Sequence, residues 1–255
     1  MIISTLLVSL LSVAPAIPAH HNWYHPEPGI SWQWQLSGPI DTSYKVDLYD
    51  VDLVETPQKT IDELHAQGSK VICYFSAGSV EKDRADAKEF PKEIIGKSLD
   101  GWPDENWLDV AHYQKFSKIM RARLDLAVKK NCDGVEPDNI DAYLQYTGFT
   151  ITNKQQLQYN RWLARQAHRR GLAIALKNNG TQAHSLSGQF DFAIVEQCFE
   201  FYECNQYNSF IEKNKAVLGV EYELDPKDFC PQAKRKKFSW LKMTYELDGG
   251  REACE

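Results

Sequence analysis

The sequence lacks the basic excess typical of proteins that bind nucleic acids. Lysine and arginine number 29 against 35 aspartates and glutamates, which gives a net charge of −6. Nucleic-acid phosphates attract basic surfaces, so this balance argues against a nucleic-acid partner and favours a neutral or cationic one. No Gly-x-Gly-x-x-Gly sequence or phosphate-binding loop follows the first apolar segment, which argues against a nucleotide. We expect no cofactor.

Spacings typical of metal ligands are also missing. The sequence contains no Cys-x-x-Cys pair and no histidine set at zinc-binding spacing, so we expect no metal. A metal-dependent deacetylase built on Asp50 and Asp52 would need histidine ligands, and no histidine falls at the end of an expected strand. The even count of 6 cysteines suggests disulfides in an oxidising compartment. Among the many possible pairings, we consider Cys198–Cys204, Cys230–Cys254 and Cys73–Cys132.

No apolar run at the N-terminus is long enough to cross a membrane. Residues 1–13 are almost wholly aliphatic or Ser/Thr, whereas a spanning helix needs roughly 20 apolar residues. Small residues suited to cleavage follow at Ala14-Pro15-Ala16 and Ile17-Pro18-Ala19. Residues 1–19 are therefore predicted to be a signal peptide, although they contain no lysine or arginine; an uncleaved anchor or a buried first helix is the alternative. The mature protein is expected to be secreted and free of the membrane.

From residue 30 onward, short apolar segments alternate with longer amphipathic ones. Helices are expected over Thr60–Gln67, Tyr113–Lys129, Lys154–Arg170 and Ser209–Asn214. Strands are expected over Ile30–Leu36, Tyr44–Tyr49, Lys70–Ser76, Cys132–Glu136, Leu172–Leu176, Phe192–Glu196, Ala216–Glu221 and Trp240–Thr244. This alternation predicts a parallel sheet, and eight strands favour a single (β/α)₈ TIM barrel over an open doubly wound sheet. We expect a monomeric catalytic domain over residues 20–255.

Polar residues gather where the expected strands end, which is where such barrels place their active sites. Side chains alternate between the two faces of a strand, so Glu136 and Asp138 share one face, and Glu196 shares the face of Ile194. If these faces point inward, Asp138 and Glu196 meet over the mouth of the barrel. The alternative is that each carboxylate merely forms an ion pair with a nearby cation such as Lys177 or Arg84, or caps a helix.

Two carboxylates across a cleft are what glycosidic cleavage requires. One must protonate the leaving oxygen, while the other attacks C1 or activates water. Ionised Asp138 is expected to raise the pKa of Glu196 above its ordinary value.

Aromatic rings that stack on sugars and polar side chains near the strand ends are predicted to bind the substrate. Trp107 is the strongest aromatic candidate because it lies in a predicted polar loop, Asp104-Glu105-Asn106-Trp107. Single aromatic residues are more often part of a core. The predicted substrate-binding residues are Trp34, Asp50, Asp52, Tyr74, Ser76, Trp107, Glu136, Asn139, Lys177, Gln197, Glu221 and Tyr222. A separate sequon, Asn179-Gly180-Thr181, is a possible glycan acceptor.

These residues resemble the endo-α-1,4-polygalactosaminidases, glycoside hydrolase family 114. The resemblance runs in order from about Ser31 to Tyr222, and residues from Leu224 onward carry none of it. It rests on Trp34–Leu36, Asp47–Asp52, Val71–Ser79, Trp107–Asp109, Cys132–Asn139, Leu176–Asn178, Phe192–Ala193, Glu196–Cys198, Glu203–Cys204 and Glu221–Tyr222.

The resemblance implies a (β/α)₈ barrel that hydrolyses α-1,4-linked galactosamine from within the chain. It implies Asp138 as the nucleophile, Glu196 as the general acid/base and a retaining mechanism. The expected partner is a cationic or partly acetylated galactosamine polysaccharide, whose protonated amines an acidic cleft would attract. The rival hypotheses are a barrel glycosidase that acts on a neutral glycan and a barrel that binds carbohydrate without cleaving it.

Overall fold

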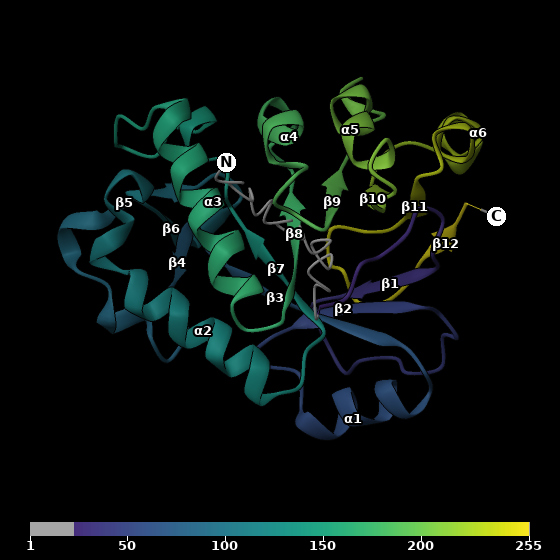
Figure 1. The fold of residues 1–255 in the computed structure, drawn as a ribbon, viewed down its shortest axis with the longest axis horizontal. Coiled ribbons are helices and arrows are strands. Elements are labelled where there is room, and N and C mark those ends of the chain that lie inside the picture. The colour runs from purple at the N-terminus through teal and green to yellow at the C-terminus, as the bar shows by residue number, and fades with distance from the viewer. Residues whose placement is uncertain (1–22, 255) are drawn as a thin grey trace, which may run out of the picture.

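A computed structural model describes residues 23–254, so the predicted signal peptide lies outside the described residues. Its centre is a sheet of eight parallel strands in chain order, with a ninth, antiparallel strand β12 (Glu252–Ala253) on the last of them (Figure 1). The parallel strands are β1 (Trp32–Gln35), β2 (Leu48–Asp52), β3 (Lys70–Ser76), β7 (Gly134–Asp138), β8 (Ala173–Lys177), β9 (Phe192–Glu196), β10 (Val217–Glu221) and β11 (Ser239–Lys242).

The sheet curls into the predicted (β/α)₈ barrel. The indole nitrogen of Trp32 in β1 donates a 3.1 Å hydrogen bond to the carbonyl of Ser239 in β11, so side-chain contacts join the first strand to the last parallel one. The backbone amide of Leu36 also donates to the carbonyl of Leu247, at 3.0 Å. All eight expected strands are confirmed, but the second begins later than expected, at Leu48. Its acidic residues belong to the strand rather than to a loop after it.

Helices cover the outside of the sheet (Figure 1). Six α-helices follow the second to seventh parallel strands, and within residues 23–254 the connection from β1 to β2 contains no helix. The α-helices are α1 (Gln58–Ala66), α2 (Ser117–Lys129), α3 (Asn153–His168), α4 (Gly180–Leu186), α5 (Asn208–Ile211) and α6 (Pro226–Lys236). The 3₁₀ turns are η1 (Ala87–Glu89), η2 (Lys92–Ile94), η3 (Val110–Lys115), η4 (Ala142–Leu144) and η5 (Cys204–Tyr207).

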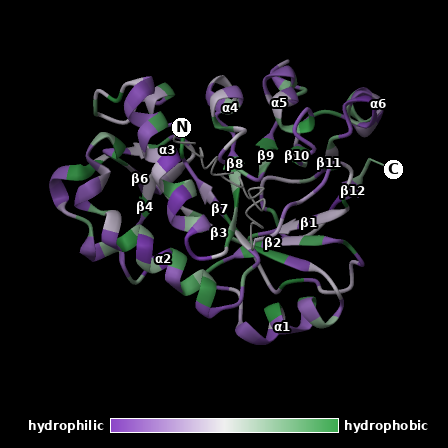
Figure 2. Cartoon of the chain, in the orientation of Figure 1, coloured by the Kyte–Doolittle hydropathy of each residue, from purple (hydrophilic) through white to green (hydrophobic). Residues whose placement is uncertain are grey.

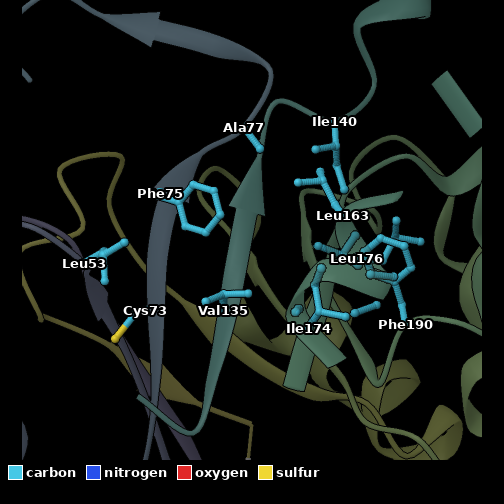
Figure 3. Packing of buried hydrophobic residues seen from close by; sticks show 14 of the residues in the cluster. Leu53, Cys73, Phe75, Ala77, Val135, Ile140, Leu163, Ile174, Leu176 and Phe190 are labelled. Carbon is cyan, nitrogen blue, oxygen red and sulfur yellow. The ribbon is translucent and has the colours of Figure 1, made fainter. Parts of the chain in front are cut away.

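Alternation along the strands produces two apolar layers. Outward-facing side chains such as Val135 and Ile174 pack with Leu163 of α3 in the layer between sheet and helices (Figure 3). The helices accordingly contain both hydrophobic and hydrophilic residues along their length (Figure 2). Inward-facing side chains form a second cluster inside the barrel, which includes Trp34 and Phe192. Polar residues on the inward face near the strand ends therefore lie above an apolar floor.

A second, antiparallel sheet is inserted between β3 and α2. Its order is β4 (Ser79–Glu81), β6 (Trp102–Leu108) and β5 (Ile95–Leu99). The expectation that residues 104–107 form a polar loop is wrong. Asp, Asn and Glu disfavour strands by propensity, yet β6 is paired with a neighbour on each side. This sheet stands beside the carboxyl ends of the barrel strands.

Three disulfides connect the described cysteines, and they are the considered pairs. Cys73–Cys132 ties β3 to the segment before β7, and Cys198–Cys204 closes the turn after β9. Cys230–Cys254 fastens α6 to β12 and its flanking residues. Within residues 23–254, no helix is both long and apolar enough to cross a bilayer.

Candidate active site

A cleft of about 1230 Å³ opens at the carboxyl ends of the barrel strands. One wall comes from the inserted sheet, and the floor comes from inward-facing strand residues. Ten of the residues predicted to act at the site line it: Trp34, Asp52, Tyr74, Trp107, Asp138, Asn139, Lys177, Glu196, Gln197 and Tyr222. Four others, Asp50, Ser76, Glu136 and Glu221, are fully buried and lie outside its lining.

Lys177 is the electrostatic centre of the floor. Its side chain is 2% exposed, and its ammonium lies 3.1 Å from Oε1 of Glu136, 3.1 Å from Oδ2 of Asp138 and 3.3 Å from Oε2 of Glu196. Burial alone would lower the pKa of Lys177, but these three carboxylates raise it well above its ordinary value. The ammonium therefore stays charged and holds the carboxylates of Asp138 and Glu196 close to each other. Asp138 and Glu196 therefore form ion pairs with Lys177, as the alternative hypothesis stated, and they also line the cleft.

Glu196 is fixed by three neighbours. The Tyr222 hydroxyl donates to Oε1 at 2.5 Å, and the Asn178 side-chain amide donates to Oε2 at 3.1 Å. Burial alone would raise the pKa of Glu196, but Lys177 and these two hydrogen bonds outweigh it and lower the pKa. The expectation of a raised pKa is therefore wrong, because the sequence did not reveal that one buried ammonium contacts both carboxylates.

Asp138 presents one oxygen to the cleft floor and the other to the backbone. Oδ2 faces Lys177, while Oδ1 accepts a 2.6 Å hydrogen bond from the backbone amide of Asn139. The nearest oxygens of Asp138 and Glu196 can be no farther apart than the sum of their distances to the Lys177 nitrogen, about 6.4 Å. The two carboxylates therefore share one side of the barrel, as the strand alternation predicted.

The backbone turns sharply immediately after each of these three residues. Asn139, Asn178 and Gln197 have positive φ angles of 59°, 48° and 56°. Residues other than glycine adopt this left-handed region rarely, and asparagine tolerates it best. Local strain of this kind persists where surrounding structure fixes it, and it gathers at functional sites. Here it ends β7, β8 and β9 so that their last side chains face the cleft.

Asp50 and Glu136 form a carboxyl pair below Lys177, both fully buried. Burial and the neighbouring Glu136 raise the pKa of Asp50 well above its ordinary value. Burial also raises the pKa of Glu136, to about 7. The raised pKa favours the neutral form of Asp50 beside Glu136. These residues support the cleft from beneath and do not contact its surface, contrary to the expectation of direct substrate binding.

Glu221 and Ser76 were predicted to bind the substrate, but both form hydrogen bonds within the protein. Glu221 faces outward and accepts hydrogen bonds from the backbone amide of Phe199 at 2.9 Å and the Trp240 indole at 3.3 Å. Ser76 lies 2.5 Å from the Ser79 hydroxyl and accepts from the Asn139 side chain at 2.9 Å. Strand parity puts Glu221 on the opposite face from Tyr222, so the two could not both face the cleft.

Asp52 lines the cleft but is already engaged. Its Oδ2 lies 2.5 Å from Arg84, and its Oδ1 accepts from the backbone amides of Val54 and Glu55 at 2.7 Å. Arg84 also binds Glu81 at 2.8 Å. Asp52 therefore anchors the inserted sheet to the barrel through Arg84.

The predicted aromatic residues differ in their roles. The Trp34 ring lies 4.9 Å from the Lys177 ammonium, in a cation–π contact at the cleft floor. Tyr222 stacks on Tyr245 with ring centres 4.2 Å apart. Trp107 lies in β6 and is 7% exposed. It lines the cleft, but its ring is too buried to offer an open face on which a sugar could stack.

The sequon at Asn179 is structural. Asn179 is 3% exposed, and its amide donates to the carbonyl of Ile140 at 3.0 Å and to Gln182 at 3.1 Å. A glycan would replace one of the two hydrogens on this nitrogen and break one of these hydrogen bonds, and the buried side chain leaves little room for a sugar, so this structure disfavours Asn179 as a glycan acceptor.

Several cleft residues were not predicted. Glu105 lines the wall, accepts from the Ser79 hydroxyl at 2.7 Å, and has a pKa raised to about 7 chiefly by burial. Asn178 holds Glu196 through both ends of its amide. Four exposed aromatic residues also line the cleft: Trp102, Tyr146, Phe201 and Tyr245. Asn178 could have been predicted, because it belongs to the polar segment Lys177-Asn178-Asn179 at the end of an expected strand. The other residues do not follow an expected strand, so the sequence did not indicate them.

Comparisons with known proteins identify the family of the chain. The sequence matches the family described as Glycoside-hydrolase family GH114 over residues 13–255. Ega3 of Aspergillus fumigatus, solved in complex with galactosamine, is 35% identical, with a TM-score of 0.86 over 91% of this chain and 97% of that one. A comparison with curated proteins gave no match.

Two more distant structures show the fold alone. The glycoside hydrolase domain of PelA from Pseudomonas aeruginosa is 15% identical, with a TM-score of 0.67 over 88% of this chain and 98% of that one. The α-galactosidase TtGalA from Thermus thermophilus is 11% identical, with a TM-score of 0.53 over 87% of this chain and 59% of that one.

Proposed function

We propose that this chain, which belongs to glycoside hydrolase family 114, cleaves α-1,4-linked galactosamine within a partly deacetylated polysaccharide. The observation that carries the proposal is the pair of carboxylates held on one buried ammonium at the floor of an open cleft. The 35% identity to a protein solved with galactosamine supports the choice of sugar.

In the proposed reaction, Asp138 attacks C1 of the sugar while Glu196 gives its proton to the leaving oxygen. Water then hydrolyses the glycosyl ester on Asp138, with Glu196 taking the proton from that water. Retaining enzymes hold the two carboxyl groups about 5–5.5 Å apart, whereas inverting ones need roughly 6.5–9.5 Å. The upper limit of about 6.4 Å on their nearest oxygens agrees with the retaining spacing, and we propose the retaining mechanism.

The charge of the cleft suits a cationic polymer. Nine acidic residues line it: Asp52, Glu81, Asp100, Glu105, Asp138, Asp141, Glu196, Glu203 and Glu246. The lining cations are Arg84, Lys97 and Lys177. A negative cleft attracts protonated amines and speeds their encounter, and salt weakens the effect. It also stabilises the positive charge that develops on the reacting sugar.

Three disulfides are typical of proteins that fold in oxidising compartments, which supports secretion after removal of residues 1–19. We further propose that the mature enzyme, residues 20–255, acts as a monomer.

Polymer digestion tests the activity and its substrate together. The purified protein should cleave deacetylated galactosamine polymer faster than the fully acetylated polymer, and added salt should slow the former. Equal rates on both polymers, independent of salt, would favour a neutral-glycan hydrolase. Binding without any release of shorter chains would favour the non-catalytic alternative.

Replacing Tyr222 with Phe should move the pH profile. The hydrogen bond from Tyr222 lowers the pKa of Glu196, so its loss raises that pKa. Because Glu196 must be protonated to act as the acid, kcat/KM for the polymer falls as pH rises past this pKa. In Tyr222→Phe that fall should begin at a higher pH, and the phenyl ring preserves stacking on Tyr245. A profile that is unchanged, or moved to lower pH, contradicts the assignment of Glu196 as the acid.

A further inference from the structure

The three cationic side chains that line the cleft, Arg84, Lys97 and Lys177, differ in their partners. Arg84 and Lys177 are held by carboxylates at 3.3 Å or less. Lys97, on β5, places its ammonium 3.3 Å from the centre of the Tyr146 ring. Among the described residues, this ring is the partner that the structure gives to the Lys97 side chain.

Tyr146 is positioned as a platform. It follows η4, its side chain is 80% exposed, and it lines the cleft. Few large rings of the described chain are so exposed, and an aromatic face open to a cleft is suited to a sugar or a cation.

The backbone fixes Lys97 and Tyr146 relative to each other. The amide of Lys97 donates a 2.9 Å hydrogen bond to the carbonyl of Thr147. Gly96 packs so closely that a Cβ atom there would lie 2.2 Å from the same carbonyl oxygen. The inserted sheet and the loop after η4 thus meet at this point, and the ring is held where the ammonium can reach it.

We propose that the face of Tyr146 is a binding subsite for the protonated amine of a galactosamine unit away from the bond that is cleaved. Lys97 occupies this subsite in the free enzyme and leaves it when the substrate binds. This inference rests on the proposed function. A primary ammonium above the ring is the same chemical group that the deacetylated sugar carries, and an N-acetyl group would lack its charge.

The test uses deacetylated galactosamine oligosaccharides long enough to reach beyond the reacting bond. Tyr146→Leu should raise KM for these several-fold with little change in kcat, whereas Tyr146→Phe keeps the aromatic face and should resemble the wild type. The KM of Tyr146→Leu for fully acetylated oligosaccharides should change much less. Tyr202→Leu removes a ring that is 93% exposed and outside the cleft lining, and it serves as the matched control.

Lys97 gives an independent measurement. Lys97→Met should lower KM for deacetylated oligosaccharides, because the resident ammonium no longer competes for the ring. Removing any cation from an acidic cleft could have this effect, so the variant is repeated in Tyr146→Leu. The decrease in KM should largely disappear in that background. The control Lys118→Met changes an exposed residue of α2 and should not lower KM.

A gain from Lys97→Met that persists fully in Tyr146→Leu would overturn the subsite and indicate general electrostatic attraction. Unchanged KM in Tyr146→Leu would overturn it too. Both results presuppose that the wild type cleaves the deacetylated oligosaccharides. If it does not, the proposed function fails before the subsite is tested.

Discussion

Replacing Asp138 with Asn should reduce turnover of deacetylated galactosamine polymer by more than about 10⁴-fold, the scale seen when a catalytic nucleophile is removed. The amide has nearly the same shape and can still accept the hydrogen bond from the Asn139 backbone. It cannot form the glycosyl ester. The change should therefore abolish the chemistry while the fold and substrate binding are retained.

The measurement is release of reducing ends, accompanied by circular dichroism to show that the variant folds. Asp141→Asn is the matched control, since Asp141 also lines the cleft and follows the same strand. Near-normal turnover in Asp138→Asn would show that another carboxylate attacks the sugar. A much larger loss in Asp141→Asn would then identify Asp141 as that residue.

Replacing Lys177 with Met should lower the free energy of unfolding by about 3–5 kcal/mol, as expected when one partner of a buried ion pair is removed. The ammonium is 2% exposed and lies within 3.3 Å of three carboxylates. Without it, Glu136 and Glu196 lose a counter-charge and their pKa values rise, because Lys177 lowers both. Urea denaturation measures the loss, and the pH profile of any residual activity should move upward.

Part of this loss should be recovered by adding Glu136→Gln to Lys177→Met. Glu136 is fully buried, and neutralising it removes the charge that most needs the ammonium. Asp50→Asn is the contrasting change, because burial and Glu136 raise the pKa of Asp50 and favour its neutral form, which a neutral amide replaces without a change of charge. If Glu136→Gln recovers no more stability than Asp50→Asn does, the assignment of charge within this cluster is wrong.

The sequence revealed the barrel because its strands are short apolar runs separated by amphipathic helices. Strand alternation also put Asp138 on the same face as Glu136, and Glu196 on the same face as Ile194, since parity is a local property; that both faces point inward came from the structure. The inserted sheet was missed for the opposite reason. The strand β6 contains proline, aspartate, glutamate and asparagine, and it forms through pairing with β4 and β5 rather than through propensity.

Charges within the site could not be predicted because they depend on distances across the barrel. Lys177 was expected at the rim, but its burial among three carboxylates reverses the expected shift in the pKa of Glu196. The sequence also did not show how far below the cleft surface each side chain lies. Asp50 and Glu136 share the inward face of their strands with residues at the rim, but they lie one step lower and do not reach the cleft surface. Strand alternation predicts which face of a strand a side chain occupies, whereas its depth below the cleft depends on the packing of the whole barrel.

The most direct test of the account is to trap the covalent intermediate. Glu196→Gln is incubated with an α-galactosaminyl oligosaccharide fluoride, whose fluoride leaves without help from an acid. Asp138 should displace the fluoride and form a glycosyl ester that hydrolyses slowly, since no base remains to activate water. Mass spectrometry of the intact protein and its peptides should find one oligosaccharide on the peptide that contains Asp138. An adduct on another residue, or rapid release of fluoride with no adduct, would contradict the account.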